Sequence, residues 1–131
     1  MKKGVLLHAE LSRLVASLGH GDRVVVADAG LPVPAGTPCI DLAVSRGVPG
    51  IEPVLRALLA EMAVERAAMA AEARQRSPDF AALVEALLPG VPLDEPAHED
   101  FKAQTRGARA LVRTGEFTPY ANLILVAGVV F

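Results

Sequence analysis

The amino-acid sequence predicts an α/β fold, with one three-layer α/β/α domain over residues 1–131 built around a mostly parallel sheet. Short apolar, often β-branched runs alternate along the chain with segments whose apolar residues recur at helical spacing. The length of 131 residues suits a single domain, and neither an internal repeat nor a linker interrupts it. These observations together favour one compact α/β unit.

The first predicted elements are a helix, a buried strand and a short second strand. A helix is expected over residues 10–19, with Gly19 as its left-handed cap. A strand is expected over residues 23–29, because valines form a short β-branched run there. Residues 29–36 contain two prolines that an interior strand excludes, so they predict a loop before a short strand at 39–44.

The longest predicted helix covers residues 53–76, with Pro53 in its first turn. Its apolar residues share one face and its charged residues lie mainly off it. That apolar face comprises Leu55, Leu58, Leu59, Met62 and Met69.

Further elements follow in the last third of the chain. A helix over residues 77–88 is started by a Ser-Pro-Asp sequence. Three prolines make residues 88–96 a loop or a broken edge strand, and a short helix is expected at 98–106. Two strands, 110–114 and 122–130, complete the predicted domain.

The amino-acid composition of the chain limits the classes of partner that it can be expected to bind. The chain is 52% hydrophobic and 21% charged with a net charge of −2, and it has no basic stretch interleaved with aromatics, so no nucleic-acid partner is expected. The longest apolar run, residues 123–131, is far below the ~20 residues that span a bilayer, so no membrane partner is expected either. A chain this apolar, with few charges to cover its surface, is expected to bury part of that surface against copies of itself, so a homo-oligomer is predicted.

Cysteine and histidine usage argues against a metal site. Cys39 is the only cysteine, and its apolar neighbours predict a small core residue. One cysteine suits a reducing cytosol, so a cytoplasmic location is expected. With no Cys pair and no His-x-x-x-His, the sequence predicts no metal, and phosphate-loop, dinucleotide and nucleophile-elbow motifs are missing too.

Two candidate functional residues flank the first strand. His20 lies between two glycines, where a catalytic ring would stay reachable; the alternative is a histidine that closes a helix C-terminus. Asp28 ends an apolar run, so it is expected to be paired or functional; the alternative is a turn-forming aspartate before Gly30.

Three further candidates lie in the last third. Tyr120 is the only tyrosine and could pack on a ligand, and Asn122 offers both a donor and an acceptor to hydroxyl groups or caps a strand edge. His98 lies in an acidic stretch that would favour its protonated form, or simply marks a solvated helix start. Without a metal or a nucleophile, this set suits proton transfer on a polar small molecule.

Several separate motifs, in order from end to end, resemble the ribose pyranase/fucose mutarotase family. They are Met1-Lys-Lys-Gly4, Leu18-Gly-His-Gly-Asp22, Asp28-Ala-Gly-Leu-Pro-Val-Pro34, Phe101-Lys-Ala-Gln-Thr105, Arg113-Thr-Gly-Glu116 and Pro119-Tyr-Ala-Asn-Leu-Ile-Leu125. The fucose branch shares the Gly-His-x-Asp and Tyr-x-Asn elements but looks different after Asp28, so the resemblance favours the ribose branch.

The resemblance implies a cofactor-independent isomerase that interconverts the pyranose and furanose forms of D-ribose and feeds ribose catabolism. A mutarotase for L-fucose or another monosaccharide, or a non-catalytic sugar-binding protein, are the alternatives. His20 would be the catalytic acid/base, and the sugar-binding residues would be Asp28, His98, Tyr120, Ala121 and Asn122.

The same resemblance implies a mixed six-stranded sheet and a ring-shaped homo-oligomer, expected to be a decamer, with sites in clefts between neighbouring subunits. The chain departs from the family in two places. His8 stands where asparagine is common, and the proline-rich segment 88–96 before His98 is short.

Overall fold

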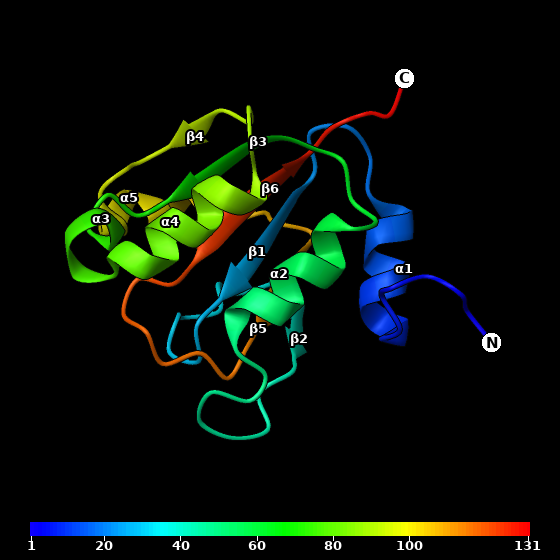
Figure 1. Ribbon diagram of the computed structural model, residues 1–131, viewed down its shortest axis with the longest axis horizontal. Helices are drawn as coiled ribbons and strands as arrows, with labels where there is room; N and C mark the ends of the chain where they lie inside the picture. The colour runs from blue at the N-terminus through cyan, green and yellow to red at the C-terminus, as the bar shows by residue number, and fades with distance from the viewer.

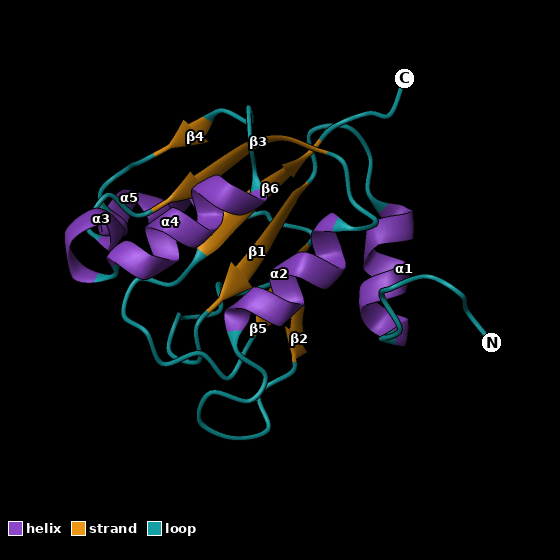
Figure 2. Cartoon of the chain, in the orientation of Figure 1, coloured by secondary structure: helices purple, strands orange, loops and turns teal.

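The computed structural model describes all residues from Met1 to Phe131 as a six-stranded sheet with helices on both faces (Figures 1 and 2). The strand order is β2-β5-β1-β6-β3-β4. The strands are β1 (Arg23–Ala27), β2 (Cys39–Asp41), β3 (Val64–Met69), β4 (Leu93–Asp94), β5 (Ala110–Arg113) and β6 (Leu123–Ala127). The helices are α1 (Ala9–Ser17), α2 (Ile51–Leu59), α3 (Ala73–Arg76), α4 (Pro78–Leu87) and α5 (His98–Gln104).

The sheet is mixed and mostly parallel, as predicted. β1 pairs with β5, β2 with β5 and β3 with β4 in parallel. β6 alone runs the other way, between β1 and β3. Because Leu123 lies opposite Val26 and Val126 opposite Arg23, the start of β6 meets the end of β1, and the end of β6 meets the start of β1.

Alternating side chains of β1 divide the core between two layers. Val24 and Val26 pack in a cluster with Leu14 of α1, Leu55 of α2 and Val84 of α4. Val25 and Ala27 point the other way, into a smaller cluster with Phe101 of α5 and Leu31. A strand buried on both faces needs a continuous apolar run, which is what β1 has, and the three-layer prediction is confirmed.

The prediction of one helix over residues 53–76 is wrong. The helical segment ends at Leu59, residues 64–69 form β3 and a short helix, α3, follows. Alanine, glutamate and methionine dominate β3 and favour helix locally. Burial overrides that preference, because Ala67 and Met69 face one core cluster and Ala68 the other.

Two smaller predictions are also wrong. α1 ends at Ser17 with Leu18 as its cap, and the left-handed glycine is Gly21, with a φ of +81°, instead of Gly19. Cys39 is exposed instead of buried, because in β2 it is Ile40 that faces the core and its neighbours Cys39 and Asp41 that face away. The broken edge strand anticipated in residues 88–96 is confirmed as β4.

No helix of the protein combines the length and the apolar character that crossing a membrane requires.

Candidate functional site

The end of β1 and the start of β6 are joined by a reciprocal pair of hydrogen bonds. The backbone N–H of Asp28 donates to Oδ1 of Asn122 over 2.8 Å, and Nδ2 of Asn122 donates to Oδ2 of Asp28 over 2.9 Å. Asn122 is 1% exposed, so an unmatched amide there would be costly. Oδ1 of Asp28 also accepts from the N–H of Gly30, so this aspartate both forms a turn and is paired.

An aromatic wall stands beside this pair. The ring of His98, the first residue of α5, meets the edge of Tyr120 at 5.0 Å between centroids and stacks on Phe101 at 6.3 Å. Its Nδ1 atom is buried and makes no hydrogen bond within the protein. Both carboxylate oxygens of Glu72 accept from the His98 backbone N–H. That hydrogen bond is the main cause that lowers the pKa of Glu72 below its ordinary value.

Tyr120 adopts a left-handed backbone conformation, with a φ of +59°, although it is not a glycine. Such residues are uncommon and concentrate at functional sites. The turn is held by hydrogen bonds from the N–H of Ala121 to the carbonyl of Thr118 and from the N–H of Asn122 to the carbonyl of Tyr120. The turn thereby directs Tyr120 toward His98 and Asn122 toward Asp28.

A cavity of about 320 Å³ opens where these side chains converge. Asp28, His98, Tyr120 and Asn122, four of the six residues singled out from the sequence, line it. Arg76 also lines it, which sequence reasoning did not anticipate. No group of three or more His, Cys, Asp or Glu side chains is arranged to hold a metal ion. The donors and acceptors present can orient hydroxyl groups and exchange protons with them.

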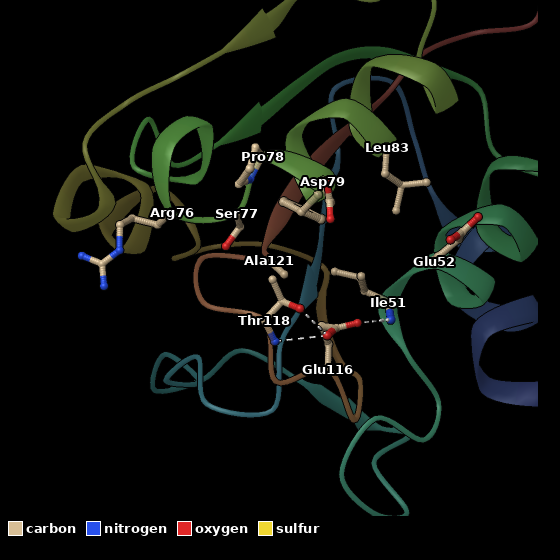
Figure 3. Close-up of a pocket in the computed structure, with 11 residues that line it drawn as sticks. Ile51, Glu52, Arg76, Ser77, Pro78, Asp79, Leu83, Glu116, Thr118 and Ala121 are labelled. Atoms are coloured by element: carbon tan, nitrogen blue, oxygen red, sulfur yellow. Dashed lines mark hydrogen bonds between the residues drawn. The ribbon is translucent and has the colours of Figure 1, made fainter.

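Ala121 lines a second cavity of about 380 Å³, together with Glu116 and Thr118 (Figure 3). Glu116 accepts hydrogen bonds there from the backbone of Ile51, Phe117 and Thr118 and from the Thr118 hydroxyl. Burial raises the pKa of Glu116, but these hydrogen bonds outweigh it and hold the pKa below its ordinary value. Glu116 therefore clamps the loop that carries Tyr120, a role that its place in the sequence did not reveal.

His20 lies at the opposite end of the sheet. It precedes β1, and the adjacent Gly21 donates its N–H to the carbonyl of Ala127 at the end of β6. Asp22 and Asp28 are separated by the length of β1, or about 20 Å at the rise of an extended strand. Nε2 of His20 instead lies 2.6 Å from Oε2 of Glu65. One chain therefore does not bring His20 to the cavity that Asp28 and Asn122 line.

The fold and the polar cavity define a class: an α/β domain with a site suited to a small, hydroxyl-rich molecule. The chain belongs to the RbsD / FucU transport protein family, whose model matches residues 1–130. It is 56% identical to the D-ribose pyranase of Chloroflexus aggregans and 55% identical to that of Paracidovorax citrulli, each over 131 residues and the whole of both chains.

Solved structures give the same relationship. The structure of Bacillus subtilis RbsD complexed with D-ribose is 46% identical and matches with a TM-score of 0.97 over the whole of both chains. The fucose mutarotase of Streptococcus pneumoniae, solved in complex with L-fucose, is 26% identical with a TM-score of 0.83, also over the whole of both chains. The ribose branch is therefore more similar to this chain than that fucose mutarotase is.

Proposed function

We propose that the protein is a D-ribose pyranase, a cofactor-independent isomerase that interconverts the pyranose and furanose forms of D-ribose and feeds ribose catabolism in the cytoplasm. One observation carries the proposal. A polar cavity lined by Asp28, His98, Tyr120 and Asn122 occurs in a chain that is 56% identical, end to end, to a D-ribose pyranase. A single domain over residues 1–131 is part of this proposal.

The cavity residues are proposed to bind the sugar. The carboxylate of Asp28 is fixed by Asn122 and Gly30, so it can accept from a sugar hydroxyl without rearranging. His98 lines the same cavity, and its imidazole is proposed to bond a second hydroxyl. The ring of Tyr120 would pack on the sugar, while Ala121 and Asn122 shape the turn behind it.

The reaction needs only proton transfer. On opening, His20 donates a proton to the ring oxygen as the bond from C1 to that oxygen breaks, the anomeric hydroxyl loses its proton back to His20, and C1 becomes an aldehyde. On closing, a different hydroxyl attacks C1 and gives up its proton, and the carbonyl oxygen is reprotonated. Histidine suits both directions because its neutral and protonated forms are both accessible near neutral pH.

The site is proposed to form between two copies of the chain. His20 precedes Asp22, which lies about 20 Å along β1 from Asp28, so His20 is too far to act on the same sugar within one subunit. The C-terminal segment beside His20 also leaves Val130 and Phe131 exposed, and an apolar surface of this kind suits contact with another copy. We propose a homo-oligomer, expected to be a decamer, in which His20 of one subunit meets the cavity of its neighbour.

The test is saturation-transfer NMR between the β-pyranose and furanose signals of D-ribose. The wild-type protein is expected to accelerate exchange, and His20→Ala is expected to lose about 10²–10⁴-fold of it, the usual contribution of general acid–base catalysis. Lys3→Ala serves as a control, because Lys3 lies in the exposed N-terminal segment.

Three other outcomes would revise the proposal. Acceleration of L-fucose exchange in place of ribose would indicate a mutarotase. Ribose binding without acceleration would indicate a sugar-binding protein. Acceleration that survives in His20→Ala would move the acid/base role to another residue, with His98 the first to be substituted.

A further inference from the structure

We propose that Glu65 is a positioning residue for His20. It holds the imidazole through Nε2 and so leaves Nδ1 as the atom that exchanges protons with the sugar. The part of this inference that concerns the sugar rests on the proposed function. The part that concerns the ring stands on the geometry alone.

The two side chains form a close and exposed pair. Nε2 of His20 lies 2.6 Å from Oε2 of Glu65, and their side chains are 62% and 42% exposed. A carboxylate can only accept, so Nε2 carries the proton in this contact. Exposed ion pairs add little to the stability of a fold, so stability alone does not explain why these two side chains are paired.

The backbone of β3 is shaped to present Glu65. The register of β3 against β6 shifts between Val64 and Arg66, which leaves Glu65 as the extra residue of a bulge. Bulges re-aim a side chain and are common beside active sites. The start of β3, the end of β6 and the start of β1 lie together at the upper right of Figure 1, so the bulge lies at the His20 end of the sheet.

Gly128 makes room for the bulge. A Cβ atom at this position would lie 3.1 Å from Cβ and 3.3 Å from the backbone nitrogen of Glu65. Such contacts are tighter than side chains normally tolerate, and the N–H of Gly128 already donates to the carbonyl of Ala63. The glycine thus lets β6 approach the bulge that carries Glu65.

The backbone around His20 is held on both sides. The N–H of Gly21 donates to Ala127, and Oδ2 of Asp22 accepts from the N–H of Gly19 at 2.8 Å and from Arg109 at 3.0 Å. Asp22 is thereby engaged with other groups, and Asp28 is at the far end of β1. Within one chain, Glu65 is the carboxylate that reaches the His20 ring.

In this arrangement the two ring nitrogens of His20 have different roles: Nε2 bonds Glu65 and Nδ1 transfers protons. The imidazolium donates a proton from Nδ1 to the ring oxygen. With Nε2–H donating to Glu65, the neutral ring then has a free electron pair on Nδ1, which takes the proton of the anomeric hydroxyl. Before and after these transfers, the negative charge of Glu65 stabilises the positive ring.

The test uses the assembled protein with ¹⁵N-labelled histidines. The ring ¹⁵N shifts of His20, assigned by their loss in His20→Ala, are expected to show the Nε2-protonated tautomer before any sugar is added. Glu65→Ala removes the acceptor and is expected to give mixed tautomers. Glu65→Gln retains an acceptor without charge and is expected to keep more of the tautomer preference.

Ribose exchange gives a second readout. In both Glu65 variants kcat is expected to fall by about 10- to 100-fold with KM little changed, less than the loss of the acid/base itself. Glu61→Gln is the matched control, since Glu61 lines the same cavity as His20 but bonds Lys2, and it is expected to retain both the tautomer and kcat.

Two results would overturn the proposal: an Nδ1-protonated His20 in the wild type, or a tautomer and a kcat unchanged in Glu65→Ala. The failure of the proposed function is distinguishable from both. If the wild-type protein accelerates no sugar exchange, the pyranase assignment fails, while the tautomers of the wild type and Glu65→Ala still decide whether Glu65 positions the ring.

Discussion

Asp28 and Asn122, which are 94 residues apart in the chain, exchange two hydrogen bonds where β1 ends and β6 begins. One bond uses the backbone of Asp28 and the other its carboxylate, so the amide of Asn122 fixes both the turn and the charge. The carboxylate is therefore oriented before any ligand arrives, which lowers the entropic cost of binding.

Asn122→Ala is expected to lower the free energy of unfolding by about 1–3 kcal/mol, because the partly buried N–H of Asp28 loses its acceptor. It is also expected to raise the KM for ribose, since the Asp28 carboxylate loses its Nδ2 donor. Denaturant unfolding and NMR exchange rates measure the two effects. Thr105→Ala is a control for general destabilisation, because Thr105 is equally buried but bonds Lys102 away from the cavity. Equal KM values for the two variants would contradict the positioning of Asp28 by Asn122.

The lowered pKa of Glu72 predicts that the folded protein loses stability in acid. Its pKa is lowered in the folded protein, so its contribution is present above the ordinary glutamate pKa and disappears as the pH falls through the lowered value. The difference in unfolding free energy between wild type and Glu72→Gln is expected to shrink as the pH is lowered from about 7 to about 3. A constant difference over that range would show that the Glu72 carboxylate does not act through its charge on the start of α5.

A site shared by two copies predicts complementation. His20→Ala and Asp28→Asn are each expected to be inactive, yet subunits refolded together in equal amounts should regain about a quarter of wild-type activity, because half of the subunits supply each intact part. A mixture of His20→Ala with the double variant is the control and should stay inactive. Mixed assemblies, verified by native mass spectrometry, that show no activity would refute the shared site.

Gly115→Ala is expected to destabilise the protein by about 1–3 kcal/mol through overpacking. A Cβ there would lie 2.5 Å from the carbonyl oxygen of Ser45 and 2.6 Å from that of Val48, and backbone atoms cannot move aside cheaply. Gly19→Ala is the control, with its nearest atom at 3.6 Å, and is expected to change stability by less than about 0.5 kcal/mol. Thermal unfolding at fixed protein concentration compares the two, and equal melting temperatures would contradict the close approach.

The sequence predicted the elements whose local pattern agrees with their place in the fold. β1 is a run of valines and forms a strand buried on both faces. β3 was mistaken for helix because its residues favour helix and no glycine or proline separates it from α2. Its strand conformation depends on pairing with β6, about sixty residues later in the chain, which no local pattern expresses.

The functional site was likewise predicted from the sequence only where a local pattern indicated it. Asp28, Tyr120 and Asn122 were singled out because polar groups follow or precede buried strands, and His98 because of its acidic neighbours. All four line one cavity. Glu65 and Arg76 were placed on the polar side of a helix that does not exist, so no role was assigned to them. The separation of His20 from Asp28 follows from their places at the two ends of β1, which the sequence predicted. The meeting of Asp28 with Asn122 depends on the antiparallel pairing of β1 with β6, and this information appears only in the assembled sheet.

β6 has a consequence for the proposed assembly as a whole. Its first residue adjoins Asn122 and its last lies next to Gly128, so one five-residue strand connects the sugar-binding end of a subunit to the end that carries His20. Each subunit would then take part in two sites, because it binds sugar in its own cavity and supplies His20 to the cavity of a neighbour. The length of β6 would fix the spacing between these two sites. A lone chain would hold two incomplete halves, and catalytic output per chain would fall on dilution as the copies separate.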